Sequence, residues 1–189
     1  MTDDHVVLVD DEDRPVGLAP RATVHDDATP LHRGFSCYVL REDGAVLVTR
    51  RALDKRTWPG VWTNSFCGHP RQDEDRAETL HRYARHELDL TIADVRCVLP
   101  DFRYRAVDAS GTVENELCPV YVARAAGPVR PNPQEAMDHR WISPQELSRW
   151  VETAPWSVSP WMAEQLPGVL AALTAAAAGA ATDGDGGGA

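Results

Sequence analysis

Short apolar runs separated by turn-forming residues predict two β-hairpins within the first 50 positions. In the first hairpin, the β-branched run 6–9 and the segment 16–18 flank an acidic, proline-containing break, which is typical of an edge ribbon. In the second, the apolar segments 35–40 and 46–49 flank Asp43-Gly44, a dipeptide that favours a tight turn with a positive φ at both central residues. We expect the second hairpin to lie in the core sheet.

Apolar residues at helical spacing predict three helices. The first is expected to begin at a capping Asp73 and to run to about residue 90, with one apolar stripe. That stripe consists of Ala77, Leu80, Ala84 and Leu88. Glu87 lies within about 20° of the stripe at 100° per residue, so its carboxylate borders the core and needs a partner. The segments 144–151 and 161 to about 178 are the other two predicted helices.

A further hairpin is predicted from the segments 102–107 and 112–122, which flank a turn at Asp108-Ala109-Ser110-Gly111. The length of its loop decides which side chains face each other. Tyr104 lies opposite Glu116 only if the loop has three residues and Gly111 is left-handed. A two-residue loop would pair Tyr104 with Asn115 and turn the ring away.

Strands with interspersed helices, with no internal repeat and no dividing linker, predict one domain of the α/β (α+β) class. We expect a single mixed sheet sandwiched by helices. The domain should span residues 1–175, with an N-terminal ribbon over about 5–19 and a catalytic core over about 30–165. The Ala/Gly-rich segment 176–189 has little to bury and is expected to be a disordered tail.

Charge and cysteine content narrow the class of protein. The formal net charge of −10 disfavours nucleic acid as a partner, because nucleic-acid binding relies on a broad basic face. No stretch approaches the ~18 consecutive apolar residues of a membrane span, and the acidic opening segment does not resemble a secretion signal. The cysteines at positions 37, 67, 97 and 118 form no CxxC pair. We expect a cytoplasmic protein with reduced thiols and no membrane partner, and we expect a monomer.

The segment 50–56 is a basic run in an acidic protein, with four cations and one anion in seven residues. It is either an exposed basic loop or a site for a small, dense anion such as a diphosphate. A diphosphate site would not require the rest of the surface to be basic.

Glu114 and Glu116 lie two positions apart on a predicted strand, so both carboxylates project from the same face. That face is either exposed or binds a cation, and the apolar run 117–122 that follows favours burial and therefore a metal ion. Three histidines are candidate nitrogen ligands, although their spacing does not join them, and each alone fits a surface or hydrogen-bonded histidine. They are His25, His32 and His69. Mixed imidazole and carboxylate ligation suits Mn²⁺, Mg²⁺ or Zn²⁺.

Cys67 lies between polar residues and Gly68, a glycine that lets the backbone approach a ligand closely. A thiol with the ordinary pKa of about 8.5 can give or accept a proton near neutrality. Cys67 is therefore a candidate acid or base, and its alternative role is that of a small buried apolar residue.

Several longer motifs join these residues. They are the basic run leading into Trp58-Pro59-Gly60-Val61-Trp62-Thr63-Asn64-Ser65, then Cys67-Gly68-His69-Pro70, Glu114-Asn115-Glu116-Leu117-Cys118-Pro119, and the segments 101–105 and 159–162. In these motifs, which cover about residues 5–165, the chain resembles the type I isopentenyl diphosphate isomerases of the Nudix superfamily. The resemblance implies a Nudix-like fold and the conversion of isopentenyl diphosphate to dimethylallyl diphosphate.

The resemblance also implies two metal sites and a site for a small-molecule diphosphate substrate. The first metal, Mn²⁺ or Mg²⁺ or else Zn²⁺, would be held by His25, His32, His69, Glu114 and Glu116. A second ion, Mg²⁺, would join the diphosphate to Glu87 and to the backbone carbonyl of Cys67, which supplies the partner that Glu87 lacks. Arg21, Arg51 and Lys55 would hold diphosphate oxygens.

The superfamily hallmark, Gly-x5-Glu-x7-Arg-Glu-x2-Glu-Glu-x-Gly, is only partly present. Its matching residues are Gly68, Glu74, Arg82 and Glu87, whereas Tyr83, His86 and Asp89 replace two glutamates and the closing glycine. Nudix hydrolases use those glutamates to bind the metals that activate water, so their loss favours isomerisation over hydrolysis. Tyr83 also stands where many isomerases carry an arginine.

By the same resemblance, Cys67 and Glu116 flank the hydrocarbon part of the substrate. We expect Glu116, assisted by Tyr104, to deliver a proton to C4, and the Cys67 thiolate to remove one from C2. Trp161 either stabilises the tertiary cation at C3, by about 2 kcal/mol if the cation is desolvated, or simply packs in the core. The rival functions are a Nudix diphosphate hydrolase and a non-catalytic metal-binding module.

Overall fold

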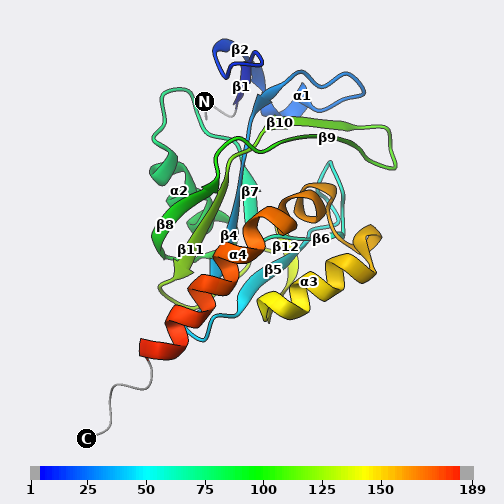
Figure 1. The fold of residues 1–189 in the computed structure, drawn as a ribbon. Coiled ribbons are helices and arrows are strands. Elements are labelled where there is room, and N and C mark those ends of the chain that lie inside the picture. The colour runs from blue at the N-terminus through cyan, green and yellow to red at the C-terminus, as the bar shows by residue number, and fades with distance from the viewer. Residues whose placement is uncertain (1–4, 184–189) are drawn as a thin grey trace, which may run out of the picture.

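The strands of the protein divide between two sheets, and the smaller sheet lies at the top of the view in Figure 1. This computed structural model describes residues 5–183. The five-stranded sheet has the order β2-β1-β3-β10-β9, formed by Pro15–Pro20, His5–Val9, His32–Arg33, Val113–Leu117 and Arg103–Val107. The seven-stranded sheet follows the path β12-β5-β4-β11-β8, formed by Ala136–Ile142, Val46–Arg51, Phe35–Leu40, Val120–Ala125 and Ile92–Leu99. Two short strands, β6 (Trp62–Thr63) and β7 (Phe66–Gly68), pair with β5 and β4.

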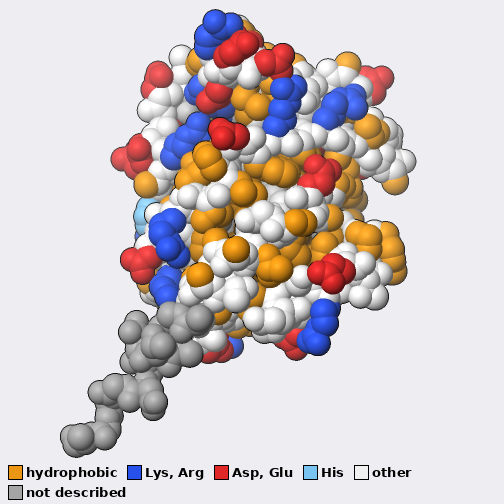
Figure 2. Space-filling model, in the orientation of Figure 1, with side chains coloured by type: hydrophobic (Ala, Val, Ile, Leu, Met, Phe, Trp, Pro, Cys, Tyr) orange, Lys and Arg blue, Asp and Glu red, His pale blue; other side chains and the backbone are white. Residues whose placement is uncertain are grey.

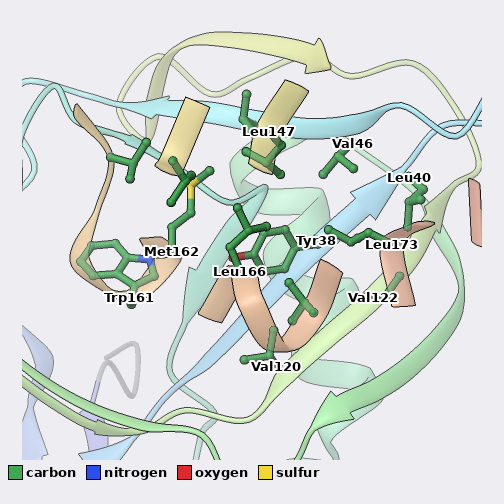
Figure 3. Close-up of a cluster of buried hydrophobic side chains, with 14 of the residues drawn as sticks. Tyr38, Leu40, Val46, Val120, Val122, Leu147, Trp161, Met162, Leu166 and Leu173 are labelled. Atoms are coloured by element: carbon green, nitrogen blue, oxygen red, sulfur yellow. The ribbon is translucent and has the colours of Figure 1, made fainter. Parts of the chain in front are cut away.

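The seven-stranded sheet is covered by helices on both faces, because its central strands are almost entirely apolar and alternate residues point to opposite sides. Tyr38 of β4 joins a cluster that includes residues of α3 (Pro144–Thr153) and α4 (Pro160–Asp183). Its neighbour Val39 belongs to the cluster on the other face, which includes residues of α2 (Arg76–Leu88). Figure 3 shows the first cluster, where Met162, Leu166 and Leu173 of α4 lie with Tyr38 and Val122 of the sheet.

Two chain segments cross side by side from the small sheet to the large one. β3 continues through Gly34 into β4, and β10 continues through Cys118 and Pro119 into β11. The strands pair in parallel on both sides of these three residues, which we call the sheet junction. Within it, the N–H of Gly34 donates to Leu117 O at 2.9 Å and that of Ser36 donates to Pro119 O at 3.1 Å.

The prediction of one continuous strand over residues 112–122 is therefore wrong. It consists of β10 in one sheet and β11 in the other, and the break falls at the sheet junction. Pro119 has no N–H to continue the first ladder, which explains why the strand ends there.

The N-terminal ribbon is confirmed, since β1 and β2 are antiparallel. The three-residue loop of the third hairpin is also confirmed, because Tyr104 pairs with Glu116 and Gly111 has a φ of 90°.

The prediction of a tight turn at Asp43-Gly44 is wrong. Only Gly44 of this pair has a positive φ, of 79°, and the loop spans three residues, closed by a hydrogen bond of 2.8 Å from Arg41 N to Ala45 O. The Asp43 carboxylate accepts from Ala45 N at 3.1 Å, which stabilises the longer loop.

The first predicted helix exists, but its cap lies two residues later than expected. Asp75, and not Asp73, caps α2, and its carboxylate accepts from the N–H groups of Ala77 and Glu78. Asp73 has a left-handed φ of 58°, so it lies in the turn before the helix. Three residues of the expected stripe are buried, whereas Ala77 is exposed and Tyr83 is buried in its place.

The two C-terminal helices are confirmed. α3 begins with Pro144 behind a capping box formed by Ser143 and Glu146. α4 is longer than predicted and continues to Asp183, so part of the expected tail 176–189 is helical. The remaining positions, 184–189, lie outside the described residues.

The α+β class and the helix-covered mixed sheet are confirmed, with two sheets where the sequence indicated one. The sequence pattern does not predict β8 and β12, since polar residues interrupt both strands. Among residues 5–183, no helix combines the length and apolar character needed to cross a membrane. In the view of Figure 2, hydrophobic side chains gather in the middle of the face that α4 crosses, and charged side chains of both signs lie toward the end that carries β1 and β2.

Leu173→Ala should lower the free energy of unfolding by about 2–5 kcal/mol, because it removes a fully buried side chain from the cluster beneath α4. The control is Leu53→Ala, whose side chain is 67% exposed and should cost less than about 0.5 kcal/mol. Urea unfolding followed by circular dichroism measures both. Equal losses in the two variants would show that α4 does not pack as described.

Candidate active site

A cavity of about 380 Å³ is lined by residues from both sheets and from α1 (Arg21–Val24), α2 and α4. Every predicted site residue lines this cavity except His32, which is fully buried against the rings of His25 and His69. The lining residues that the sequence predicts are Arg21, His25, Arg51, Lys55, Cys67, His69, Glu87, Tyr104, Glu114, Glu116 and Trp161.

Three histidines and two glutamates converge beside the cavity, although their spacing in the sequence does not join them. The ring centroids of His25, His32 and His69 are 5.1–5.5 Å apart. His69 Nε2 lies 3.0 Å from Glu116 Oε1, and His32 Nε2 lies 3.5 Å from the same oxygen. His25 Nε2 lies 3.1 Å from Glu114 Oε2. All five side chains therefore belong to one cluster, which we call the His/Glu cluster.

The sheet junction places the members of the His/Glu cluster. His32 is directly opposite Glu116 in the parallel pair of β3 and β10. Gly34, two residues further on, leaves room for the glutamate, since a Cβ atom at this position would lie 2.2 Å from Glu116 Oε2. His25 follows α1 and His69 follows β7, so both reach the cluster from loops.

Glu116 is the electrostatic centre of this cluster. Burial alone would raise the pKa of Glu116, but the hydrogen bonds from His32 and His69 outweigh burial and hold the pKa below its ordinary value. The two histidines differ from each other. Burial lowers the pKa of His69, whereas in His32 the effect of burial is overcome by Glu116, which raises the pKa.

The donor atoms of the His/Glu cluster fit a divalent metal ion. Three buried polar atoms of the cluster have no hydrogen-bond partner, namely His25 Nε2, His69 Nδ1 and Glu114 Oε2. His25 Nε2 and Glu114 Oε2 lie 3.1 Å apart without hydrogen-bond geometry, and because buried polar groups are rarely left unpaired, a cation bound by both would satisfy these two atoms. Two subsets of three side chains each offer ligand atoms that lie within 4.8 Å of one another. Imidazole nitrogen and carboxylate oxygen are donors that several divalent metals accept.

Cys67 lies at the cavity wall with two polar side chains around its sulfur. Its thiol donates to Asn64 Oδ1 at 3.1 Å, and Ser36 Oγ lies 3.4 Å from the same sulfur. Burial raises the pKa of Cys67 to about 12. Burial therefore favours the neutral thiol over the thiolate at this position.

The predicted diphosphate ligands line the cavity and also have partners within the protein. Arg51 donates to the carbonyl oxygens of Thr57, at 2.8 Å, and Trp58, at 3.2 Å, which orients its guanidinium group. Lys55 forms an ion pair with Glu135 and lies 4.0 Å from Glu87 Oε1. Burial raises the pKa of Glu87, and Lys55 opposes this effect.

Aromatic rings form the apolar part of the wall. Tyr104, opposite Glu116 on the hairpin, has its ring centroid 5.7 Å from that of Trp161, and Trp58 packs edge-on against Trp161 at 5.4 Å. The Arg51 guanidinium lies 5.3 Å from the Trp161 ring centroid. A cavity with a basic side, a thiol, a carboxylate cluster and an aromatic wall suits a substrate with an anionic head and an apolar end.

Comparison with known proteins identifies the family. Residues 30–166 match the family model described as NUDIX domain. A Clavibacter sepedonicus protein named isopentenyl-diphosphate Delta-isomerase is 57% identical over 162 residues, which cover 86% of this chain and 85% of that protein. A protein of the same name from Frankia alni is 54% identical over 164 residues, 87% of this chain and 84% of that one. The chain belongs to the Nudix-type isopentenyl-diphosphate Delta-isomerase family.

Solved structures agree with this family at the level of the fold. A Deinococcus radiodurans protein superimposes with a TM-score of 0.65 at 21% identity, covering 86% of this chain and 97% of that one. A MutT Nudix hydrolase from Burkholderia pseudomallei gives a TM-score of 0.57 at 20% identity, covering 74% of this chain and 98% of that one. These likenesses show the Nudix fold alone.

Tyr83, which departs from the Nudix hallmark, has a structural role in this family member. Its hydroxyl accepts a hydrogen bond of 3.0 Å from the backbone N–H of His69. Its ring fills the space beside Gly68, where a Cβ atom would lie 2.2 Å from the ring. Tyr83 therefore supports the segment that carries Cys67 and His69.

Sequence reasoning missed several polar residues of the site. Asn64 contacts the Cys67 thiol, Thr57 donates to Glu114 Oε1 at 2.8 Å, and Glu135 pairs with Lys55. Asn64 and Thr57 lie in or beside quoted motifs, so their position in the sequence was a usable signal. Glu135 lies in a loop distant in sequence from the others, and no local pattern indicates it.

Gly34→Ala should weaken metal binding by the His/Glu cluster about tenfold or more, because the added methyl group would displace the Glu116 carboxylate. Titration with Mn²⁺ followed by electron paramagnetic resonance measures the affinity. The matched control is Gly127→Ala, where a Cβ atom meets nothing within 4 Å and Mn²⁺ affinity should not change. Unchanged affinity in Gly34→Ala would contradict the packing of Gly34 against Glu116.

Proposed function

We propose that this protein converts isopentenyl diphosphate to dimethylallyl diphosphate. The identity of 50% and more to curated relatives with that activity in their name supports the reaction. The observation within the molecule that carries the proposal is that Cys67 and Glu116 line the same cavity as Arg51 and Lys55. The reaction adds one proton at C4, removes one from C2, and leaves the diphosphate intact.

The metal sites are part of the proposal. His25, His32, His69, Glu114 and Glu116 would hold Mn²⁺ or Mg²⁺, or else Zn²⁺, and Glu87 with the backbone carbonyl of Cys67 would hold Mg²⁺ beside the diphosphate. The buried unpaired atoms of the His/Glu cluster support the first site, and the position of Glu87 in the cavity supports the second. When bound, such ions would supply positive charge that orients the diphosphate and polarises nearby groups.

Cys67 and Glu116 are the proposed acid and base. The sequence-based expectation gives proton delivery to Glu116, with Tyr104 opposite it on the hairpin, and proton removal to the Cys67 thiolate. The raised pKa of Cys67 instead favours a thiol that donates first, because the neutral form predominates at neutral pH. In either order one group gives a proton and the other takes one. A turnover in the reverse direction therefore returns both groups to their starting protonation states.

Trp161 and the diphosphate ligands complete the proposed site. The indole ring would face the positive charge that develops at C3, and together with Trp58 and Tyr104, which pack against it, would exclude water from that region. Arg21, Arg51 and Lys55 would bind the diphosphate oxygens. Lys55 would then form ion pairs with both the substrate and Glu135.

We also propose a cellular context for the enzyme. All four cysteines are free, which suits a reducing cytoplasm, and we infer a cytoplasmic enzyme that acts as a monomer on a small substrate. The domain limits of 1–175, with a catalytic core over about 30–165, remain predictions.

Incubation of isopentenyl diphosphate with the protein and Mg²⁺ in D₂O tests the reaction. We expect dimethylallyl diphosphate that carries deuterium in a methyl group, detected by NMR and mass spectrometry, and no product after chelation of the metal. Release of phosphate without isomerisation would instead support a Nudix hydrolase. If neither dimethylallyl diphosphate nor deuterium uptake is detected, the proposal is wrong.

Cys67→Ser should reduce kcat by about 10³-fold, because a hydroxyl is a poor replacement for a thiol in proton transfer. The control Cys97→Ser replaces an exposed free thiol outside the cavity and should leave kcat unchanged. Steady-state kinetics with isopentenyl diphosphate measures both. Comparable kcat values in the two variants would remove Cys67 from the mechanism.

A further inference from the structure

One oxygen atom joins the thiol and the indole ring of the site. Asn64 Oδ1 accepts hydrogen bonds from Cys67 Sγ at 3.1 Å, from Trp161 Nε1 at 3.0 Å and from Thr63 Oγ1 at 2.9 Å. Asn64 is fully buried. The relative position of the sulfur and the aromatic face therefore depends on where this carboxamide oxygen lies.

The orientation of the Asn64 carboxamide is fixed by its other end. Nδ2 donates to the backbone carbonyl oxygens of Cys37, at 3.0 Å, and Phe66, at 2.9 Å. A rotated amide would place its oxygen against these two carbonyls, which cannot donate. The hydrogen bonds to backbone thus direct Oδ1 toward Cys67 and Trp161 and disfavour the rotated amide.

A second polar side chain holds the sulfur from another direction. Ser36 Oγ lies 3.4 Å from Cys67 Sγ and accepts a hydrogen bond of 2.9 Å from Gln165 Nε2. Tyr38 in turn donates to Gln165 Oε1 at 3.2 Å, which fixes that amide as well. Because Gln165 occupies an acceptor site of the Ser36 hydroxyl, the hydroxyl hydrogen is directed to a sulfur, that of Cys67 or of Cys118 at 3.5 Å.

We propose that Asn64 is a positioning residue, which sets the direction of the Cys67 thiol and the plane of the Trp161 ring through a shared acceptor atom. This inference rests on the proposed function, in which the thiol exchanges a proton with the substrate and the ring faces the C3 cation. Both groups must meet a small hydrocarbon at the correct distance, and a displacement of about 1 Å can cost about 10²-fold in rate. A residue that holds both at once acts on the chemical step more than on substrate binding.

The test replaces the carboxamide with an isosteric apolar side chain. Asn64→Leu should lower kcat about 50-fold or more, with KM changed less than about threefold, because the diphosphate contacts are untouched. The infrared S–H stretch of Cys67, assigned by its loss in Cys67→Ser, should shift to the higher frequency of a thiol that donates no hydrogen bond. A residue with a purely structural role would not move this band.

Thr49→Val is the matched control. Thr49 is buried and its hydroxyl donates to the backbone carbonyls of Asn64, at 3.0 Å, and Ser65, at 3.2 Å. The substitution loosens the same loop without touching the thiol or the indole, so kcat per folded molecule and the S–H band should stay close to wild type. Equal losses of kcat in Thr49→Val and Asn64→Leu, or an unshifted band in Asn64→Leu, would overturn the inference.

Asn64→Asp keeps the test decisive if the leucine variant does not fold. One carboxylate oxygen still faces Cys67 and Trp161, while the other meets the carbonyls of Cys37 and Phe66, so stability should fall while the S–H band stays in its hydrogen-bonded position. A band at the free-thiol frequency in Asn64→Asp would contradict the proposal.

Wild-type protein that fails to isomerise would overturn the proposed function and this inference together. Isomerisation by wild type with full kcat in Asn64→Leu would overturn the inference alone.

Discussion

The parallel pairing that runs through the sheet junction is the constraint on which the rest of the structure depends. Two strands leave the small sheet together and enter the large one together, held across the gap by the N–H groups of Gly34 and Ser36. His32 and Glu116 are opposite each other just before the crossing, and Ser36, just after it, has its hydroxyl 3.5 Å from the sulfur of Cys118 in the sheet junction. The site therefore lies where the backbone changes sheet, and a shift of this parallel register by one residue would move Glu116 away from His32.

Burial then determines the electrostatic character of the site. Glu114 and Glu116 are buried among three imidazole rings, and the carboxylate of Glu116 stays ionised only because two of those rings donate to it. Cys67 has no cationic partner at hydrogen-bonding distance among the described residues, so the same effect of burial is not overcome there and raises its pKa, which favours the neutral thiol. The pKa values of two groups in one cavity are thus shifted in opposite directions, an arrangement that suits acid–base chemistry in a single site.

Local chemistry made part of this structure predictable from the sequence. The loop ending at Gly111 determines that Tyr104 faces Glu116, and the apolar stripe of α2 places Glu87 beside the core. Contacts between distant segments were not predictable in this way. Nothing near Lys55 indicates an ion pair with Glu135, and nothing in the spacing of the three histidines brings their rings together. The error at Asp43 has a local origin, because its side chain accepts from Ala45 N and favours a longer turn than the dipeptide alone implies. Site residues beyond the reach of local patterns came from the family resemblance.

The contact between Tyr83 and Gly68 has a consequence for how this sequence can evolve. A ring that fills the space of a missing side chain makes position 68 intolerant of anything larger than glycine while tyrosine is present at position 83. A smaller side chain at position 83 would remove this restriction and would leave a void beneath the Cys67-Gly68-His69 backbone. Change at either position is tied to change at the other.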